Sequence, residues 1–297
     1  MRIGIIGGGS IGLLCAAYLA EKQDVILFTH RKIQADLIQE NGLFFDNKSH
    51  HKIQVHAVEL QHASQQLEGL DLVLVTVKQY HLKALLPTIK SVNTTFVFLQ
   101  NGMTKNELMN EFKGKIVFGI VSHGAQKIAD NIIRHNGIGK IILDATWLSQ
   151  FQVEDLSVEN FPFETTNDIQ SQIIDKLIVN AIVNPITAIY RVKNGELILN
   201  SELINLKNQL AQEIFRILKI DELQAQQKAL EYVDQICSRT AQNKSSMLQD
   251  IEQGRQTEVD SILGYLSDRA VEVQVAAPLV NEFYRRVKEL SEDPRKS

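Results

Sequence analysis

Cysteine and proline are scarce in this sequence, and the scarcity of cysteine excludes a disulfide framework. The 297 residues include 2 Cys and 5 Pro. Cys15 and Cys237 are far apart, and neither belongs to a Cys-x-x-Cys pair of the kind that binds zinc. The 8 His residues also lack the spacing that places two ligands on one metal ion. We therefore expect no metal site and a reducing, cytoplasmic environment.

An excess of charge of one sign is also missing. The 31 Lys and Arg residues and 35 Asp and Glu residues leave a formal net charge of −4, which does not suit a protein that binds nucleic acid through many phosphate contacts. A composition with 44% hydrophobic and 22% charged residues is typical of soluble globular proteins. At about 150 residues per domain, the length indicates two domains.

A long uninterrupted hydrophobic helix is not predicted at the N-terminus either. Residues 3–20 contain no charged residue, and the small residues of CAAYLA at 15–20 resemble a signal-peptide cleavage site. Five glycines within this stretch would break the continuous apolar helix that a signal peptide or a membrane span requires. We therefore expect neither a targeting segment nor a membrane-spanning segment here.

The first half of the chain alternates between apolar runs and helical patterns. The apolar runs predict buried parallel strands at 2–6, 24–29, 70–77, 95–99 and 116–121. Helical patterns fall between them at 11–21, 33–40, 80–89 and 105–112. Two weaker runs, 43–46 and 52–57, predict a loosely formed pair of strands. This alternation is typical of an α/β domain in which helices cover both faces of a doubly wound parallel sheet.

The second half of the chain is predicted to be all-α. Two more strands are expected at 132–135 and 140–143, and after them apolar residues recur at spacings of three and four. The predicted helices are 168–182, 201–218, 221–242, 257–273 and 278–290. The polar stretch between residues 147 and 168 separates the two patterns. We therefore predict an N-terminal domain of residues 1–165 and a helical domain of residues 166–297.

The turn after the first strand carries a phosphate-binding motif. Its residues, Gly7, Gly8, Gly9, Ser10, Ile11 and Gly12, match G-x-G-x-x-G between a strand and a helix. In such a motif the first glycine allows a tight turn, the second lets the backbone approach a pyrophosphate, and the third lets helix and strand pack closely. The start of the helix then offers N–H groups to the anion. The motif predicts dinucleotide binding.

The end of the second strand indicates which dinucleotide is bound. An NAD site usually has an acid there that accepts from the ribose 2′-hydroxyl. This sequence instead has Arg31 and Lys32 after Phe-Thr-His, without an acid. A guanidinium at Arg31 could pair with a 2′-phosphate through two hydrogen bonds. We therefore predict NADPH as the cofactor, although the two basic residues could also be a solvated helix start.

Three polar residues recur at spacings of four in an otherwise apolar helix. Lys176, Asn180 and Asn184 then project from one side, where they could line a binding site or form a solvated face. Their apolar neighbours favour a buried helix in which the amides need partners. Pro185 follows directly, so the helix is expected to kink or end near Asn184.

Taken together, these residues resemble the ketopantoate reductase family. The matching segments span nearly the whole chain: IGIIGGGSIG at 3–12, TVKQY at 76–80, LQNGM at 99–103, KLIVNAIVNPITAI at 176–189, NGEL at 194–197 and NKSSMLQDIEQGRQTEVDSI at 243–262. The resemblance implies a Rossmann domain followed by a helical domain of the 6-phosphogluconate dehydrogenase type, with the active site in the cleft between them. It also implies NADPH-dependent reduction of 2-dehydropantoate to pantoate, on the route to pantothenate and coenzyme A.

The resemblance also assigns roles to single residues. It implies that Lys176 is the general acid and that the substrate is bound by Asn180, Asn184, Asn194 and Ser246. Asn101 would contact both substrate and cofactor. The remaining residues would contact the cofactor: Lys78, Ala125 in the loop after 116–121, and Glu258 beside the nicotinamide ribose.

The chemistry of a ketone reduction agrees with these roles but leaves alternatives open. Lys176 could protonate the alkoxide that hydride transfer produces. Burial would lower its pKa and Glu258 would raise it, and the sequence does not decide between them. A related reductase for another 2-keto acid and a non-catalytic NADPH-binding sensor remain alternatives. The oligomeric state stays open, with a homodimer through the helical domain as one option.

Overall fold

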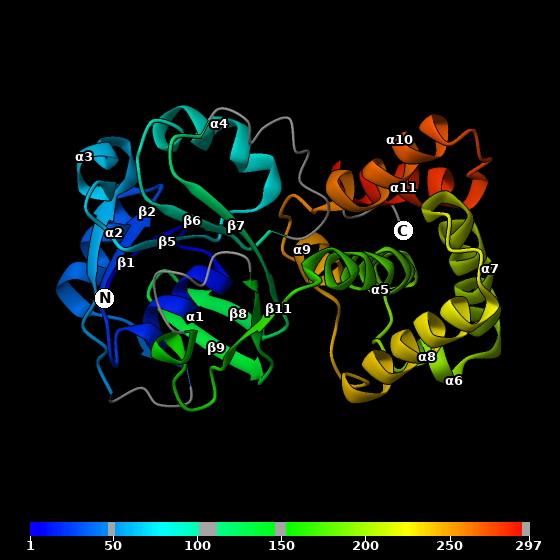
Figure 1. The fold of residues 1–297 in the computed structure, drawn as a ribbon. Coiled ribbons are helices and arrows are strands. Elements are labelled where there is room, and N and C mark those ends of the chain that lie inside the picture. The colour runs from blue at the N-terminus through cyan, green and yellow to red at the C-terminus, as the bar shows by residue number, and fades with distance from the viewer. Residues whose placement is uncertain (47–50, 101–111, 146–152, 293–297) are drawn as a thin grey trace. The chain divides into compact units, whose positions relative to one another are not determined.

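The computed structural model describes residues 1–46, 51–100, 112–145 and 153–292. The described chain divides into two compact units, the first ending at Gln170 and the second beginning at Ser171 (Figure 1). The division lies five residues beyond the predicted boundary at residue 165. Within the described part of the polar stretch between residues 147 and 168 lie a short 3-10 helix, η4 (Val153–Leu156), and a strand, β11 (Phe163–Thr166).

The first unit is built on an eight-stranded sheet of order β11-β10-β7-β6-β5-β1-β2-β4. Its other strands are β1 (Arg2–Ile6), β2 (Asp24–Thr29), β4 (His56–Glu59), β5 (Leu72–Val75), β6 (Thr95–Phe98), β7 (Lys115–Val121) and β10 (Ile141–Asp144). All neighbouring pairs are parallel except β10 and β7. The chain leaves β1 toward β2 on one side and returns to β5 on the other, so the strand order reverses at β1. Open α/β sheets bind ligands at such a reversal.

Both faces of this sheet are covered, as the apolar strands predicted (Figure 1). One face packs against α1 (Ser10–Leu19), α2 (Lys32–Asn41) and a small sheet of order β3-β9-β8. The small sheet consists of β3 (Phe44–Phe45), β8 (Gly124–Ala129) and β9 (Ile132–Gly137). The other face packs against α3 (Ser64–Leu67) and α4 (Gln79–Ile89). Successive strand residues therefore enter opposite cores: Ile5 contributes to one and Ile6 to the other.

The prediction that 43–46 and 52–57 pair with each other was largely wrong. A single bridge between Leu43 and Ile53 joins them. β3 pairs instead with β9, and β4 extends the main sheet beside β2. Strand partners lie far apart in sequence, so a short polar run does not reveal its own partner. Most of the helix predicted at 105–112 lies outside the described residues.

In the described residues of the second unit, every regular element is a helix. Its elements are α5 (Ile169–Tyr190), α6 (Glu196–Leu199), α7 (Ser201–Leu218), α8 (Leu223–Arg239), α9 (Ser246–Glu252), the π-helical turn η5 (Asp260–Gly264), α10 (Tyr265–Glu272) and α11 (Pro278–Glu292). Helix α5 is long and apolar enough to cross a membrane, with a mean hydropathy of 1.4. Its apolar residues form the core of this unit together with those of α7 and α11, so α5 is the central helix of a globular unit.

The sequence predicts that the helix kinks or ends near Asn184, and the second alternative does not occur, because α5 continues through Pro185 to Tyr190. An interior proline removes one hydrogen bond and costs about 3 kcal/mol. The turn that follows is fully packed: Ile186 and Ala188 are completely buried. Full burial of an isoleucine side chain such as Ile186 contributes about 1.5–3 kcal/mol, and this contribution offsets the lost hydrogen bond.

Candidate functional site

The glycine-rich turn of the first unit has the geometry that the motif predicted. Gly7 has a φ of +121°, which side chains rarely permit. A Cβ on Gly12 would lie 1.8 Å from the Gly7 carbonyl oxygen, so helix and turn are in close contact there. A Cβ on Gly9, by contrast, would meet no atom within 4 Å in the part of the chain that the structure describes. Gly9 is therefore the point at which a ligand could approach the backbone.

Helix α1 begins directly behind this turn. Ser10 is its first residue, and the Ser10 hydroxyl accepts a hydrogen bond from the backbone N–H of Lys127 in β8. Ile11 is half-buried against the core. The Gly8 carbonyl accepts from the Gln34 amide at 2.9 Å and from the Lys127 ammonium at 3.1 Å. Side chains from α2 and β8 thus fix the turn at its back, while the start of α1 presents N–H groups to an anion.

Basic groups surround the ends of the neighbouring strands. Arg31 directly precedes α2 and forms an ion pair with Asp130, in the turn between β8 and β9. Lys78 directly precedes α4. Burial lowers the pKa of His81 in α4, and the nearby His30 and Lys78 lower it further. The positive field that disfavours a charged His81 would attract the phosphates of a dinucleotide.

Two further candidate residues lie near the small sheet or outside the described chain. Ala125 is in β8, where it pairs with His135 of β9. It is therefore on the same strand as Lys127, which contacts the glycine-rich turn. Asn101 lies outside the described residues.

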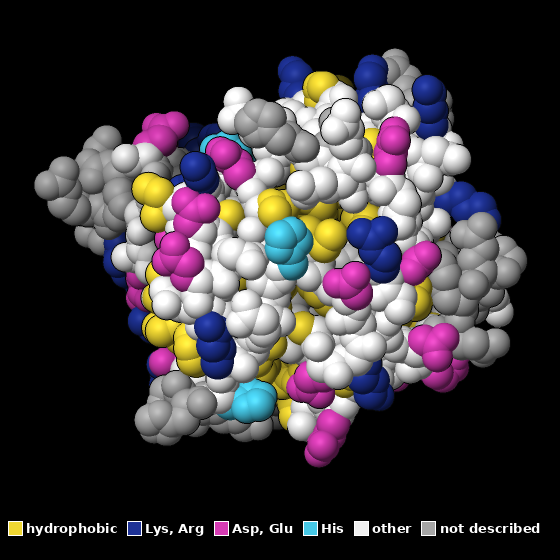
Figure 2. All heavy atoms as spheres, turned by 90° about the vertical axis from the view of Figure 1, so that its left-hand side faces the viewer, with side chains coloured by type: hydrophobic (Ala, Val, Ile, Leu, Met, Phe, Trp, Pro, Cys, Tyr) yellow, Lys and Arg dark blue, Asp and Glu magenta, His cyan; other side chains and the backbone are white. Residues whose placement is uncertain are grey.

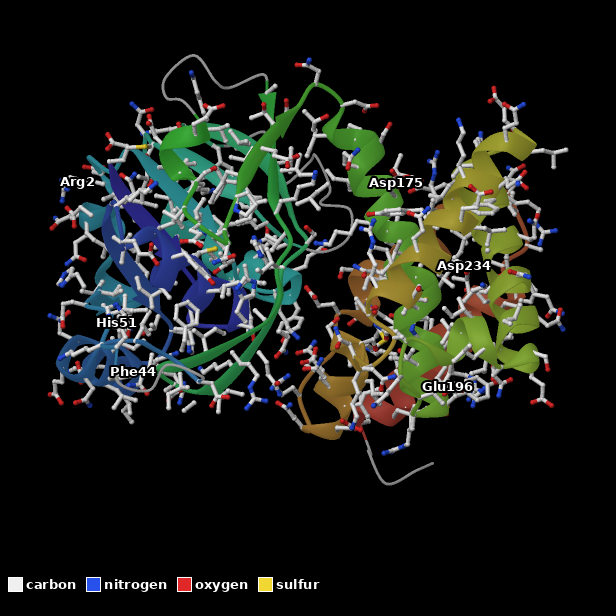
Figure 3. The ribbon with its side chains drawn as sticks, turned by 90° about the horizontal axis from the view of Figure 1, so that it is seen from below. Arg2, Phe44, His51, Asp175, Glu196 and Asp234 are labelled. Atoms are coloured by element: carbon white, nitrogen blue, oxygen red, sulfur yellow. The ribbon has the colours of Figure 1, made fainter. Side chains whose placement is uncertain are left out.

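The second unit carries the polar helix face on α5. Lys176 and Asn180 are half-buried, and Asn184 is 7% exposed. The three side chains lie on one side of the helix, as their spacing predicted. Their place on α5 can be found in Figure 3 from the label of Asp175, which directly precedes Lys176. Their apolar neighbours Leu177 and Ile178 enter the core. The face is therefore part of a partly desolvated wall.

The electrostatics of Lys176 settle a question that the sequence left open. Burial lowers the pKa of its ammonium group to about 8, although Glu258 acts in the opposite direction. Glu258 lies two residues before the π-helical turn η5 and is half-buried. The structure thus places Lys176 and Glu258 close enough to interact, with burial as the larger effect.

Hydrogen bonds connect the far end of α5 to the segment before α9. The Thr187 hydroxyl, one turn beyond Asn184, donates to the Ser245 hydroxyl at 2.7 Å. Ser245 caps α9, and the exposed Ser246 is the first residue of that helix. The Asn194 N–H donates to the Asn243 carbonyl at 3.0 Å. The structure thus brings the loops of Asn194 and Ser246 together and ties them to α5.

The side chain of Asn194 has an orientation fixed by its neighbours. Asn194 is 7% exposed, and its Nδ2 donates to the Thr240 hydroxyl, which itself donates to the Ile236 carbonyl. The Asn194 Oδ1 atom is buried and has no partner among the described residues. A buried amide oxygen needs a donor, and a ligand hydroxyl would supply one.

Several residues of these two surfaces were missed by the sequence analysis. Gln34, Lys127 and Asp130 contact one another or the glycine-rich turn, but β8 and its turn follow that motif by more than 110 residues and show no motif of their own. Ser245 had a local signal, since a serine before an apolar helical run is a typical N-cap.

Within the described chain, no group of three or more His, Cys, Asp or Glu side chains could hold a metal ion. Figure 2 shows acidic and basic side chains interspersed over one face of the first unit.

Comparison with known proteins identifies relatives along the whole chain. A family model described as Ketopantoate reductase PanE/ApbA matches residues 3–146, and a second, described as its C-terminal part, matches residues 168–291. The 2-dehydropantoate 2-reductase of Bacillus subtilis is 35% identical over 100% of this chain and 99% of its own length. That of Listeria innocua is 35% identical over 98% of this chain and 97% of its own.

Solved structures agree with this relationship. A crystal structure of the Bacillus subtilis protein is 36% identical, covers 98% of this chain and 100% of its own, and superposes with a TM-score of 0.83. A D-mandelate dehydrogenase in complex with NADH and anilino(oxo)acetate has the same fold, with a TM-score of 0.89 at 21% identity. These matches, which cover both units, show that the chain belongs to the ketopantoate reductase family.

Proposed function

We propose that this protein is an oxidoreductase that reduces 2-dehydropantoate to pantoate, with NADPH as its hydride source. The polar face of α5 carries the proposal. On this face Lys176, Asn180 and the buried Asn184 lie in one row, and the pKa of Lys176 is about 8. Membership of the ketopantoate reductase family and full-length identity to enzymes named 2-dehydropantoate 2-reductase support it.

The first unit fits a dinucleotide. The close contact between Gly12 and Gly7 and the open space at Gly9 match what a pyrophosphate requires. The cations at Arg31 and Lys78 and the start of α1 offer charge and N–H groups to phosphates. NADPH rather than NADH is supported by Arg31 and by the missing acid at the end of β2. Asn101, Ala125 and Glu258 complete the proposed cofactor contacts.

In this proposal Lys176 is the general acid. A nicotinamide dinucleotide held by the glycine-rich turn would supply the hydride for the substrate's ketone carbon, and the ketone oxygen would then carry negative charge. The Nζ of Lys176 stabilises that charge and then donates a proton to it. A pKa of about 8 suits this role, because the amine is protonated near neutral pH yet releases its proton readily.

The amide and hydroxyl groups of the second unit hold the substrate. Asn180, Asn184, Asn194 and Ser246 offer neutral donors and acceptors to the carboxylate and hydroxyl groups of a keto acid. The Asn194 Oδ1 atom, buried without a described partner, suits the substrate hydroxyl. Neutral groups add no charge that would compete with Lys176.

The division of labour follows the two units. We propose that residues 1–165 hold the cofactor and residues 166–297 supply Lys176 and the substrate contacts. Two residues depart from this division: Glu258 of the second unit also contacts the cofactor, and Asn101 also contacts the substrate. A ketopantoate reductase of Staphylococcus aureus, 21% identical to this chain, is dimeric, and a homodimer through the helical unit is our proposal here. The free, buried Cys15 and Cys237 support a cytoplasmic location.

Oxidation of NADPH, followed by its absorbance with 2-dehydropantoate and a panel of other 2-keto acids, tests the proposal. We expect 2-dehydropantoate to have the highest kcat/KM. A higher value for another acid would make the protein a reductase of that acid, and no turnover with any of them would contradict the proposal.

The Arg31→Ala variant tests the preference for NADPH. It should weaken the binding of NADPH far more than the binding of NADH, and equal losses would show that Arg31 does not bind the 2′-phosphate.

A further inference from the structure

The turn between β8 and β9 places an acid of this chain on the residue proposed to bind the 2′-phosphate. Asp130 is in this turn, and its Oδ1 atom is paired with the Arg31 guanidinium. The same oxygen accepts from the Lys127 Nζ at 2.8 Å. One carboxylate therefore holds two cations that come from segments about 100 residues apart in sequence.

Further hydrogen bonds fix this turn against the glycine-rich turn. The Gln34 Nε2 donates to the carbonyl oxygens of both Asp130 and Gly8, each at 2.9 Å. The Lys127 Nζ, besides pairing with Asp130, donates to the Gly8 carbonyl at 3.1 Å. Lys127 is thus positioned between the pyrophosphate turn and Arg31. The hydrogen bonds that the carbonyl oxygens of Gly8 and Asp130 accept do not involve the Asp130 carboxylate.

The local charges show why an anion is needed here. Helix α2 begins after Arg31, and its first turn, residues 32–35, is Lys-Ile-Gln-Ala. Cations at a helix N-terminus are repelled by the helix dipole, which favours anions there. Partial burial raises the pKa of Asp130, but hydrogen bonds and charge interactions with Lys127 and Arg31 outweigh it, so that the pKa lies below its ordinary value. Asp130 is therefore ionised and supplies the missing negative charge.

We propose that Asp130 is an internal substitute for the 2′-phosphate: it holds Arg31 and Lys127 in the free protein, and the 2′-phosphate of NADPH displaces it from both. This inference rests on the proposed NADPH site. It adds Lys127 as a second cation for the phosphate and makes Asp130 the residue that sets how strongly NADPH is preferred over NADH.

Charge decides the direction of the effect. A phosphate monoester carries about −1.5 to −2 charges at neutral pH, more than the single charge of Asp130, so it can displace the carboxylate from both cations. The displaced carboxylate then opposes phosphate binding by repulsion and by its own attraction to Arg31 and Lys127. NADH has no 2′-phosphate and leaves the cluster intact. Asp130 thus reduces the affinity for NADPH without affecting that for NADH.

The test measures binding of NADPH, NADH and the fragments 2′,5′-ADP and ADP to the full chain by calorimetry, without turnover. Asp130→Asn should bind NADPH and 2′,5′-ADP about tenfold more tightly, a change of about 1.4 kcal/mol, and NADH and ADP within twofold of wild type. Lys127→Met should weaken NADPH and 2′,5′-ADP about tenfold more than it weakens NADH and ADP, because all four ligands use the glycine-rich turn that Lys127 also supports. Asp46→Asn is the matched control, because Asp46 pairs with Arg134 of the same small sheet.

The outcomes separate this inference from the proposed function. If Asp130→Asn weakens NADPH, the carboxylate orients Arg31 rather than competing for it, and the inference is wrong. If it weakens NADH, Asp130 binds the ribose hydroxyl, and the inference is again wrong. Unchanged binding in both variants, with NADPH still dependent on Arg31, overturns the inference alone. If the wild type binds neither dinucleotide, the proposed function fails together with it.

Discussion

At Lys176 two opposing effects set the proton affinity of one amine. Burial lowers its pKa to about 8, and Glu258 raises it. A general acid must be protonated, so we expect kcat to fall as the pH rises through about 8. Glu258→Gln removes the raising effect, and the fall should then begin at a lower pH. The measurement is the pH dependence of kcat at saturating cofactor in both proteins.

Two further variants define what the pH profile means. Lys176→Ala should lower kcat by about 100-fold or more, in the range for loss of a general acid, while NADPH binding persists. Glu252→Gln, which removes an acid that pairs with Lys244, should leave the alkaline limb in place. An alkaline limb that stays unchanged in Glu258→Gln would show that Glu258 does not act on Lys176.

Residues were predictable from the sequence where their signal is local. Gly7, Gly9 and Gly12 lie within one motif, and Lys176, Asn180 and Asn184 lie on one helix, so spacing alone predicts their arrangement. The partner of Arg31 could not be found in this way, because Asp130 is 99 residues away. Its position depends on how β8 and β9 pack onto α1, which no local pattern encodes.

At the scale of the element, the glycine-rich turn separates folding from binding. Gly12→Ala would place a Cβ 1.8 Å from the Gly7 carbonyl oxygen, so we expect a clear loss of thermal stability. Gly9→Ala meets open space in the described structure, so its melting temperature should stay close to wild type while NADPH binding weakens at least about tenfold. Thermal melts and calorimetry check both. Normal NADPH binding by Gly9→Ala would exclude close approach of the cofactor at Gly9.

The start of α9 should show a similar separation between neighbouring serines. Ser245 is 5% exposed, caps α9 by accepting from Leu248 N–H, and accepts from the Thr187 hydroxyl. Ser245→Ala should lower the free energy of unfolding by about 2 kcal/mol, from the lost cap and hydrogen bond. The exposed Ser246 has neither role, so Ser246→Ala should raise KM at unchanged stability. Denaturant unfolding and steady-state kinetics distinguish them, and equal stability losses would contradict the assignment.

Elements were predictable where a periodic pattern was long, and the failures have physical causes. β1, β2 and α7 have the predicted bounds because their patterns are unbroken. α5 passes through Pro185 because burial of the following turn offsets the proline, and a rule based on local backbone preference does not include that contribution. β8 was missed because its residues are mostly half-buried or exposed, without the apolar run of a core strand.

At the scale of the whole molecule, histidine is confined to one unit. All 8 His residues precede residue 136, so the second unit has none. In the first unit Gly139 N–H donates to His123 Nδ1 at 3.0 Å, so this nitrogen carries no proton. The His135 Nε2 atom lies 3.1 Å from His123 Nδ1, and the His135 Nδ1 atom lies 2.9 Å from the Tyr18 hydroxyl oxygen. Burial is the main cause that lowers the pKa of both imidazoles below the usual value, so both rings are neutral at neutral pH in the folded protein.

This network should make the first unit alone sensitive to mild acid. Burial, and secondly His135, lower the pKa of His123 from 6.5 to about 4. Below pH 6.5 His123 is therefore protonated in the unfolded chain but stays neutral in the folded chain. The contribution of neutral His123 to folding stability is complete above about pH 6.5 and is lost as the pH falls toward 4. We expect His123 alone to cost the first unit about 1.5 kcal/mol between pH 6.5 and 5.

Hydrogen exchange at pH 6.5 and 5, read by mass spectrometry and corrected for the intrinsic rate, measures this separately for each unit. Peptides from β8 and β9 should lose protection at the lower pH, and peptides from α5 and α7 should keep theirs. His123→Gln retains an acceptor for the Gly139 N–H but does not titrate, so it should reduce the pH dependence of β8 and β9 even if the variant is less stable. Equal loss of protection in both units would mean that carboxylates, rather than the histidine network, determine the response to acid.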